Sequence, residues 1–204
     1  DAGQFAGLIG RNGAGKTTLM RTVMGLLPMR EGTLEFDGAA LGQVPTHRRV
    51  SLGIGYMPED RRLVPGLTVE ENVLLPAWSA GLADAAARLA RIYAAIPEVG
   101  ALRERRALQL SGGQQKLVAL ARSMMAGTRL LLLDEPFEGV APGLARRLAE
   151  VIAGVRRTGV TVILSESSLV HARELLDRVF VIDRGAVAAR GGREATPADG
   201  GALT

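Results

Sequence analysis

A run of eight residues near the start of the chain has the spacing of a phosphate-binding loop. The run is Gly10-Arg11-Asn12-Gly13-Ala14-Gly15-Lys16-Thr17, which follows the pattern G-x-x-x-x-G-K-[ST]. Glycines let backbone N–H groups surround a phosphate, and a helix N-terminus adds partial positive charge. Lys16 can reach the outer phosphates of a nucleotide, and the Thr17 hydroxyl can bind Mg²⁺. We therefore predict that a nucleotide binds through its phosphates to this loop and the following Thr18.

Two adjacent carboxylates, Asp134 and Glu135, follow four consecutive leucines. An unbroken apolar run of this length is typical of a strand buried on both faces, and an isolated carboxylate is costly to bury there. Together with a phosphate-binding loop, the acid that ends such a strand is expected to hold Mg²⁺. We predict this role for Asp134. We predict that Glu135 polarises or deprotonates the attacking water.

These residues require a parallel sheet to bring them together. Strands are predicted at 4–9, 33–36, 54–57, 130–133, 161–164 and 179–182. Helices are predicted at 16–24, 143–157 and near 169–176, and the segment 69–126 has helical composition. Alternating apolar strands and helices indicate an α/β fold with a mostly parallel sheet covered on both faces. We expect one domain over 1–190, with a core (1–60 and 127–190), a helical subdomain (about 61–126) and a mobile tail (191–204).

The composition is typical of a globular protein. Hydrophobic residues make up 47% of the chain, and no uncharged stretch approaches the ~20 apolar residues that a membrane span requires. There is no cysteine and no leader-like start, so we expect a soluble chain in a reducing cytoplasm. Basic residues exceed acidic ones by only four and aromatics are 3%, which favours a solvated basic surface over a nucleic-acid interface.

A second motif, Leu110-Ser111-Gly112-Gly113-Gln114-Gln115, precedes a helical run. Alone it is a capped helix start. Together with the two earlier motifs, and with the order of the three along the chain, it resembles the signature of ATP-binding cassette (ABC) ATPases. The resemblance covers residues 7–191. The resemblance implies the P-loop ABC ATPase fold, ATP as the bound nucleotide with Mg²⁺, and ATP hydrolysis. The family's antiparallel strands and their adenine-stacking aromatic precede the loop, so we expect them to be largely missing here, and we assign no adenine contact.

The resemblance also implies partners. Two cassettes pair head to tail in this family, so Ser111, Gly112, Gly113 and the neighbouring Gln114 are expected to contact the γ-phosphate bound by a second, identical or paralogous cassette. Membrane permease subunits are implied, with a solute-binding protein acting indirectly. The expected location is the cytoplasmic face of the inner membrane, and no nucleic acid is expected.

Three departures from the family pattern point to a subgroup. Glu59 replaces the usual glutamine after a Tyr-x-Pro run, and we predict that it contacts Mg²⁺ or water. Ser167 stands where the family has its switch histidine; serine can donate one hydrogen bond to a phosphate but cannot be protonated as histidine can. The segment 138–142 replaces the usual Ser-Ala-Leu-Asp. Together these look like the cassettes of branched-chain (hydrophobic) amino acid importers, with urea and amide uptake cassettes next.

Two other functions remain open at this point. A soluble cassette acting on DNA or ribosomes typically carries a coiled-coil insertion or a second cassette, for which 204 residues leave no room. A weakly hydrolytic regulatory partner is motivated by Ser167. The leading prediction is an ATP-hydrolysing importer subunit.

Overall fold

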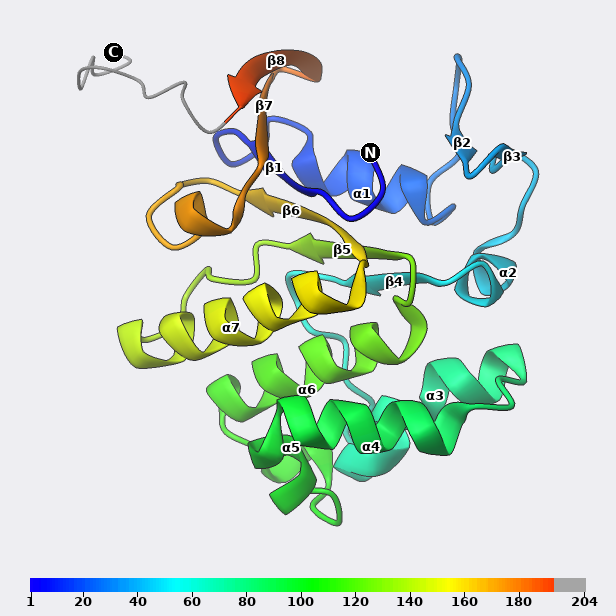
Figure 1. Ribbon diagram of the computed structural model, residues 1–204, viewed down its shortest axis with the longest axis vertical. Coiled ribbons are helices and arrows are strands. Elements are labelled where there is room, and N and C mark those ends of the chain that lie inside the picture. Colours follow the sequence, from blue (N-terminus) through cyan, green and yellow to red (C-terminus); the bar gives the residue numbers. More distant parts are fainter. Residues whose placement is uncertain (193–204) are drawn as a thin grey trace.

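A six-stranded sheet forms the centre of the protein (Figure 1). The computed structural model describes residues 1–192 of the 204-residue chain. The strand order is β4-β5-β6-β1-β7-β8; every neighbouring pair is parallel except β7 and β8, which are antiparallel. A separate antiparallel pair, β2 and β3, lies beside this sheet. The strands are β1 (Phe5–Ile9), β2 (Glu35–Phe36), β3 (Ala39–Ala40), β4 (Ile54–Met57), β5 (Leu130–Asp134), β6 (Thr161–Glu166), β7 (Arg178–Asp183) and β8 (Ala186–Gly192).

Helices cover both faces of the sheet. In Figure 1, α1 lies on one side of the strands, α7 and α6 lie on the other, and α3, α4 and α5 extend beyond α6. The helices are α1 (Lys16–Val23), α2 (Thr46–Ser51), α3 (Val69–Ala80), α4 (Ala85–Ala95), α5 (Pro97–Ala101), α6 (Gly112–Ala126) and α7 (Pro142–Val155), with 3₁₀ turns η1 (Ala107–Gln109), η2 (Arg156–Thr158) and η3 (Arg173–Leu175). Within residues 1–192 no helix has both the length and the apolar character needed to cross a membrane.

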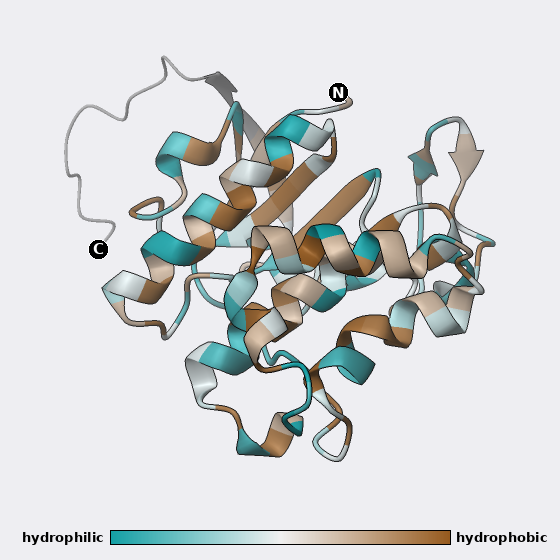
Figure 2. Ribbon diagram, turned by 60° about the horizontal axis from the view of Figure 1, so that its bottom comes forward, coloured by the Kyte–Doolittle hydropathy of each residue, from teal (hydrophilic) through white to brown (hydrophobic). Residues whose placement is uncertain are grey.

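The leucine strand β5 is buried on both of its faces. Leu131 and Leu133 belong to the large apolar cluster formed with α3, α6 and α7, whereas Leu130 and Leu132 pack with residues of α1 and β4. All five residues of β5 are buried. In Figure 2 the strands at the centre are coloured as hydrophobic and the covering helices alternate between hydrophobic and hydrophilic patches. The absence of polar alternation in the sequence is explained by this two-sided burial.

The α/β fold with a mostly parallel sheet is confirmed. The strand predicted at 33–36 is shorter than expected, since only residues 35–36 pair. The helix predicted near 169–176 is wrong. Its apolar residues Ala172, Leu175 and Leu176 have helical spacing and are buried, but one 3₁₀ turn between β6 and β7 suffices to bury them. Strand β8 was not predicted. It extends to Gly192, so residues 191 and 192 belong to a strand and not to the predicted tail. Residues 193–204 of that tail lie outside the described residues.

Gly55 lies in β4 where this strand packs against the C-terminal end of α6. A Cβ atom at this position would lie 2.1 Å from the Ser123 carbonyl oxygen and 2.7 Å from the Gly127 nitrogen. Because both neighbours are backbone atoms, Gly55→Ala should lower the free energy of unfolding by roughly 2–3 kcal/mol, measured by urea denaturation. Gly143→Ala in α7 meets nothing within 4 Å and is the control, expected to leave stability unchanged or slightly raised. Equal stability of the two variants would contradict this packing account.

Candidate nucleotide-binding and catalytic site

The glycine-rich loop joins β1 to α1 at the carboxyl edge of the sheet. Gly13 and Gly15 have φ angles of 82° and 111°, in the left-handed region that favours glycine. Gly10 has a different requirement, because a Cβ there would lie 2.3 Å from the Ile182 carbonyl oxygen. Helix α1 begins at Lys16, directly after Gly15. The free N–H groups of its first turn therefore face the loop, which is the arrangement that binds phosphate.

The Lys16 ammonium is held across this loop. Its Nζ donates to the carbonyl oxygens of Gly10 and Arg11, at 2.7 and 3.1 Å, and lies 2.9 Å from Glu135 Oε1. These three partners match the three protons of an ammonium. Lys16 is 3% exposed. A buried cation held by loop carbonyls and one carboxylate can turn toward an incoming phosphate without a change in the loop's backbone.

Asp134 lies at the end of β5 and is fully buried. Three hydroxyl groups reach its carboxylate: Ser165 Oγ at 2.6 Å and Thr17 Oγ1 at 3.2 Å donate to Oδ1, and Tyr56 OH donates to Oδ2 at 3.2 Å. Burial and then the charge of Asp134 raise the pKa of Tyr56 above its ordinary value. Asp134 is therefore held as a hydrogen-bond acceptor beside Thr17. This places the two residues predicted to hold Mg²⁺ in direct contact.

Glu135 has both strain and an unsatisfied atom. Its φ angle is 47°, which is uncommon for a residue other than glycine and concentrates at functional sites. Its N–H donates to the backbone oxygen of Ser165 at 3.1 Å, and its Oε1 pairs with Lys16. Its Oε2 is buried without a hydrogen-bond partner among the described residues. A buried carboxylate oxygen without a donor can accept a proton from a bound water.

A cavity of about 270 Å³ connects the loop to three carboxylates. Its lining consists of Asn12, Gly13, Gly15, Lys16, Thr17, Thr18, Glu59, Glu135 and Glu138. The structure thus brings together the predicted loop residues, Glu59 and Glu135. Within the loop, Ala14 is buried and Arg11 is exposed, and neither lines this cavity. Ser167 is exposed one residue beyond the end of β6 and does not line this cavity.

The signature residues lie apart from this cavity. Ser111 caps α6: its Oγ accepts from Gln114 N at 3.3 Å, and its own N–H donates to Gln114 Oε1 at 2.9 Å. Ser111 and Gly112 are exposed and none of the four signature residues lines the loop's cavity. An open, capped helix start away from its own chain's phosphate loop is what a contact with a second cassette requires.

Lys116 is a supporting residue that the sequence analysis did not assign. From the second turn of α6, its Nζ donates to the backbone oxygens of Glu135 at 2.9 Å and Glu138 at 3.1 Å. Burial lowers the pKa of Lys116. Lysine is rare in this chain, since Lys16 and Lys116 are its two lysines among 25 lysine and arginine residues. This rarity is a signal that could have singled out Lys116. This residue ties the signature helix to the loop that carries Glu135.

Ser165 and Glu166, at the end of β6, also went unassigned. Ser165 donates to Asp134, and Glu166 Oε1 accepts from the Phe137 N–H at 3.0 Å. Glu166 is 4% exposed. Burial, followed by the charge of Glu135, raises the pKa of Glu166 to about 7, although the Phe137 N–H opposes the shift. Both residues interrupt an otherwise apolar strand at the edge where Asp134 lies, which is the signal that would have found them.

The pKa of Glu166 predicts a pH-dependent stability. Its folded-state pKa lies above the ordinary value of 4.5, so the native protein binds the proton more tightly than the unfolded chain. The stability from this group is complete below pH ~4.5 and is lost as pH rises through ~7. We expect Glu166→Gln to be more stable than the parent chain by roughly 2–3 kcal/mol above pH 7, and by little at pH 4.5. Urea denaturation across pH 4.5–8 measures this. Glu174→Gln, which changes an exposed acid, is the control. If the stability difference between Glu166→Gln and the parent chain were the same at all pH values, the raised pKa of Glu166 would be contradicted.

A parallel sheet in which β1 leads through a glycine-rich loop into a helix, with two carboxylates at the end of β5, on the far side of β6 from β1, defines a P-loop nucleotide hydrolase. The chain belongs to the ABC transporter family, whose model matches residues 1–138. The resemblance stated from the motifs and the assignment as an ATPase are therefore confirmed.

Several relatives are transport cassettes. The chain is 36% identical over 185 residues to the high-affinity branched-chain amino acid transport ATP-binding protein BraG of Pseudomonas aeruginosa, which covers 91% of this chain and 79% of BraG. It is 30% identical over 193 residues to the lipopolysaccharide export system ATP-binding protein LptB of Haemophilus influenzae, 94% of this chain and 80% of LptB. A crystal structure of the ADP conformation of an ATP-binding cassette of an ABC transporter superposes with a TM-score of 0.80 at 27% identity, covering 95% of this chain and 82% of that one.

Proposed function

We propose that this chain is the ATP-hydrolysing subunit of an importer for a small polar or amphipathic solute, with branched-chain amino acids as the cargo. The observation that carries the catalytic part is the carboxylate of Glu135, which pairs with Lys16 through one oxygen and has a second, buried oxygen without a donor among the described residues. The cargo is supported by the 36% identity to BraG and by Glu59 and Ser167, which depart from the usual cassette pattern.

Binding of ATP exchanges the partners of Lys16. In this structure the Lys16 ammonium donates to two loop carbonyls and pairs with Glu135. The outer phosphates of ATP are stronger, fully charged acceptors for the same ammonium. The loop amides and the first turn of α1 bind the remaining phosphate oxygens. When Lys16 turns to the phosphates, Glu135 loses its cation and its carboxylate becomes available to a water. Glu135 then accepts a proton from that water as the water oxygen attacks the γ-phosphorus. The bond from the γ-phosphorus to the β–γ bridging oxygen breaks, and ADP is the leaving group.

The residues around Asp134 fit Mg²⁺. Thr17 and Asp134 lie in hydrogen-bond contact and offer only oxygen, and Glu59 lines the same cavity as Thr17. Among the described residues no three His, Cys, Asp or Glu side chains gather into a metal site, which agrees with an ion held by one or two side chains and by substrate phosphates. When bound, the ion would neutralise charge on the phosphates. Ser167 would supply one hydrogen bond to the γ-phosphate.

A second cassette and membrane permease subunits complete the proposed assembly. The signature residues Ser111, Gly112 and Gly113, with Gln114 closing the capping box, would meet the γ-phosphate on the partner's loop. Because the permease subunits lie in the membrane, the proposed location of the chain is the cytoplasmic face of that membrane. Division of the chain into a core and a helical subdomain at about 61–126 is part of this proposal.

The test is reconstitution with the permease that co-purifies with the chain. We expect ATP-dependent uptake of labelled leucine into proteoliposomes, with phosphate release much faster in the assembly than from the isolated chain. Urea and acetamide are the parallel substrates for the related uptake class. Uptake of neither class, with ATP-driven release of a lipid instead, would favour the export function that the 30% identity to LptB supports as a second candidate. Unchanged, slow hydrolysis in the assembly would indicate a regulatory subunit.

A further inference from the structure

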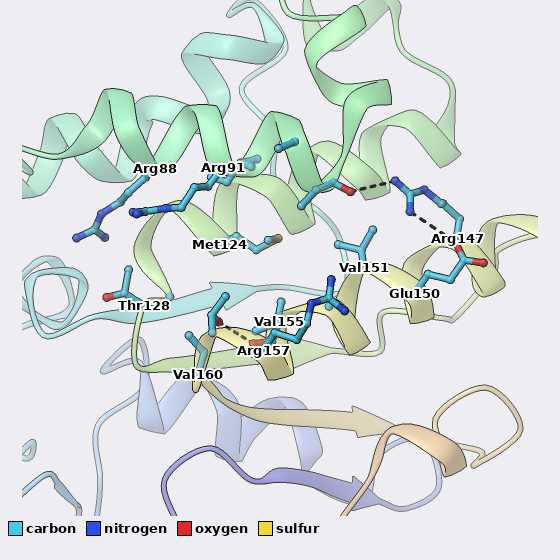
Figure 3. A pocket seen from close by; sticks show the side chains of 16 residues that line it. Arg88, Arg91, Met124, Thr128, Arg147, Glu150, Val151, Val155, Arg157 and Val160 are labelled. Carbon is cyan, nitrogen blue, oxygen red and sulfur yellow. Dashed lines mark hydrogen bonds and ion pairs between the residues drawn. The ribbon is translucent and has the colours of Figure 1, made fainter.

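Charged side chains outside the nucleotide cavity are found at both ends of β6. Near its amino end, arginines line a second cavity of about 540 Å³ (Figure 3). Arg88 pairs with Asp84 and donates to a carbonyl oxygen near the end of α6. Arg147 pairs with Glu98 and donates to a carbonyl oxygen at the end of α4, so both arginines are used by the fold. At the carboxyl end of β6, by contrast, the buried acid Glu166 has no role in the proposed mechanism.

Glu166 is bonded to the segment that carries the proposed general base. Its Oε1 accepts from the Phe137 N–H, two residues after Glu135, at 3.0 Å. Pro136, between them, has no N–H to offer. One position earlier in β6, the backbone oxygen of Ser165 accepts from the Glu135 N–H at 3.1 Å. The end of β6 therefore holds the segment on both sides of the proline.

The backbone of Glu135 requires such support. Its φ angle of 47° lies in the left-handed region, and a residue other than glycine persists there only where its surroundings fix it. Lys116 holds the carbonyl oxygens of Glu135 and Glu138, and Glu166 holds the N–H of Phe137. Loss of the Phe137 bond would remove one of these restraints and let the Glu135 carboxylate move, while the glycine-rich loop and its phosphate-binding amides stay in place.

The charge of Glu166 sets the strength of this restraint. A hydrogen bond to an ionised acceptor is roughly twice as strong as one between neutral groups. Burial raises the pKa of Glu166 to about 7, so its charge changes near neutral pH. The ionisable groups around the Glu166 carboxylate and its Phe137 partner come from α6 and from the segments after β5 and β6: Lys116, Glu135, Glu138 and His171. They include one lysine and two like charges.

We propose that Glu166 is a positioning residue for Glu135: by holding the Phe137 N–H, it keeps the Glu135 carboxylate directed into the phosphate loop's cavity, and it does so more firmly when ionised. The inference rests on the proposed ATP hydrolysis and adds to it a carboxylate that acts through the backbone. Glutamine at this position would still accept from Phe137 and should be the more stable choice above pH 7. An acid kept at a cost in stability is typical of a group that serves activity.

Two variants of Glu166 in the assembled transporter separate the bond from the charge. Glu166→Leu removes the acceptor and should lower kcat by about 10-fold, with the calorimetric ATP affinity unchanged. Glu166→Gln keeps an acceptor and should recover most of that loss at pH 6. Because glutamine cannot ionise, the ratio of the parent kcat to the Glu166→Gln kcat should rise about 5-fold between pH 6 and pH 8. Glu174→Gln, which changes an exposed acid, should follow the parent at every pH.

Hydrogen exchange of the Phe137 amide tests the bond without any hydrolysis. In the isolated, ADP-bound chain, NMR should show that Glu166→Leu lowers the protection of this amide by about 10-fold and that Glu166→Gln retains it. The Val162 amide, bonded to the Gln4 carbonyl at the other end of β6, is the internal reference and should not change.

Each result decides between defined outcomes. Phe137 protection or kcat at the parent value in Glu166→Leu would overturn the positioning role, and parallel pH profiles of the parent and Glu166→Gln would overturn its dependence on charge. If Glu166→Leu does not fold, the profile and the amide protection of Glu166→Gln still decide. A parent assembly without ATP hydrolysis would overturn the proposed function itself, a result distinct from normal parent hydrolysis that Glu166→Leu leaves unchanged.

Discussion

Replacing Glu135 by glutamine is expected to lower kcat for ATP hydrolysis by about 10²–10⁴-fold in the assembled transporter, with little change in the affinity for ATP. Glutamine has nearly the same shape and still accepts a hydrogen bond from Lys16 through its carbonyl. It cannot take a proton from water, which is the role that the unpartnered Oε2 indicates. A loss in kcat with KM retained is the kinetic signature of an interaction made only in the transition state.

The measurement is steady-state phosphate release by the reconstituted assembly, with nucleotide affinity measured separately by calorimetry. Glu174→Gln removes an exposed acid away from the loop cavity and should leave both quantities unchanged. A Glu135→Gln assembly that hydrolyses ATP at the parent rate would show that another group, such as Glu138 in the same cavity, activates the water.

Lys16→Ala should weaken ATP binding by about 100-fold or more. The ammonium provides charge-assisted hydrogen bonds to phosphate, each worth roughly 1.5–3 kcal/mol, and alanine provides none. The same change leaves the buried Glu135 carboxylate without its cation, which should lower the free energy of unfolding by about 3 kcal/mol. Calorimetric titration with Mg-ATP and urea denaturation measure the two effects.

The double variant Lys16→Ala/Glu135→Gln separates these effects. Removal of both charges eliminates the unpaired carboxylate, so the stability should return most of the way to that of the parent chain. The ATP affinity should remain low, because the phosphate ligand is still absent. Recovery of ATP affinity in the double variant would mean that Lys16 acts only as the counter-ion of Glu135.

Elements with strong local signals could be predicted from the sequence. The strand at 130–133 was evident because its burial on both faces removes polar alternation. The loop at 10–17 was evident because a plain turn before a helix needs its glycines but not Lys16 and Thr17. The failure at 169–176 has a physical reason: helical spacing of three apolar residues cannot distinguish one 3₁₀ turn from a full helix. Strand β8 depends on antiparallel pairing with β7, a contact that the local pattern does not encode.

The residues of the candidate site also fall into two groups, those that were predicted from the sequence and those that were not. The residues with a motif, such as Lys16, Thr17 and Asp134, were predicted and lie together. The residues that support them from other elements, Ser165 and Lys116, were not, because their roles depend on distances across the fold. Ser167, by contrast, was named from its place in the family's order of motifs, and its contact with a phosphate stays a prediction.

The bonds from Lys116 to the backbone of Glu135 and Glu138 have a mechanical consequence. They connect the second turn of α6, close to its exposed N-terminus, to the backbone that positions Glu135, the proposed general base. If the proposed second cassette brings its triphosphate against the N-terminus of α6, a displacement of this helix would also move the backbone that carries the Glu135 carboxylate. In the proposed dimer, contact of α6 with the nucleotide of one cassette is therefore expected to alter the position of Glu135 in the other nucleotide site.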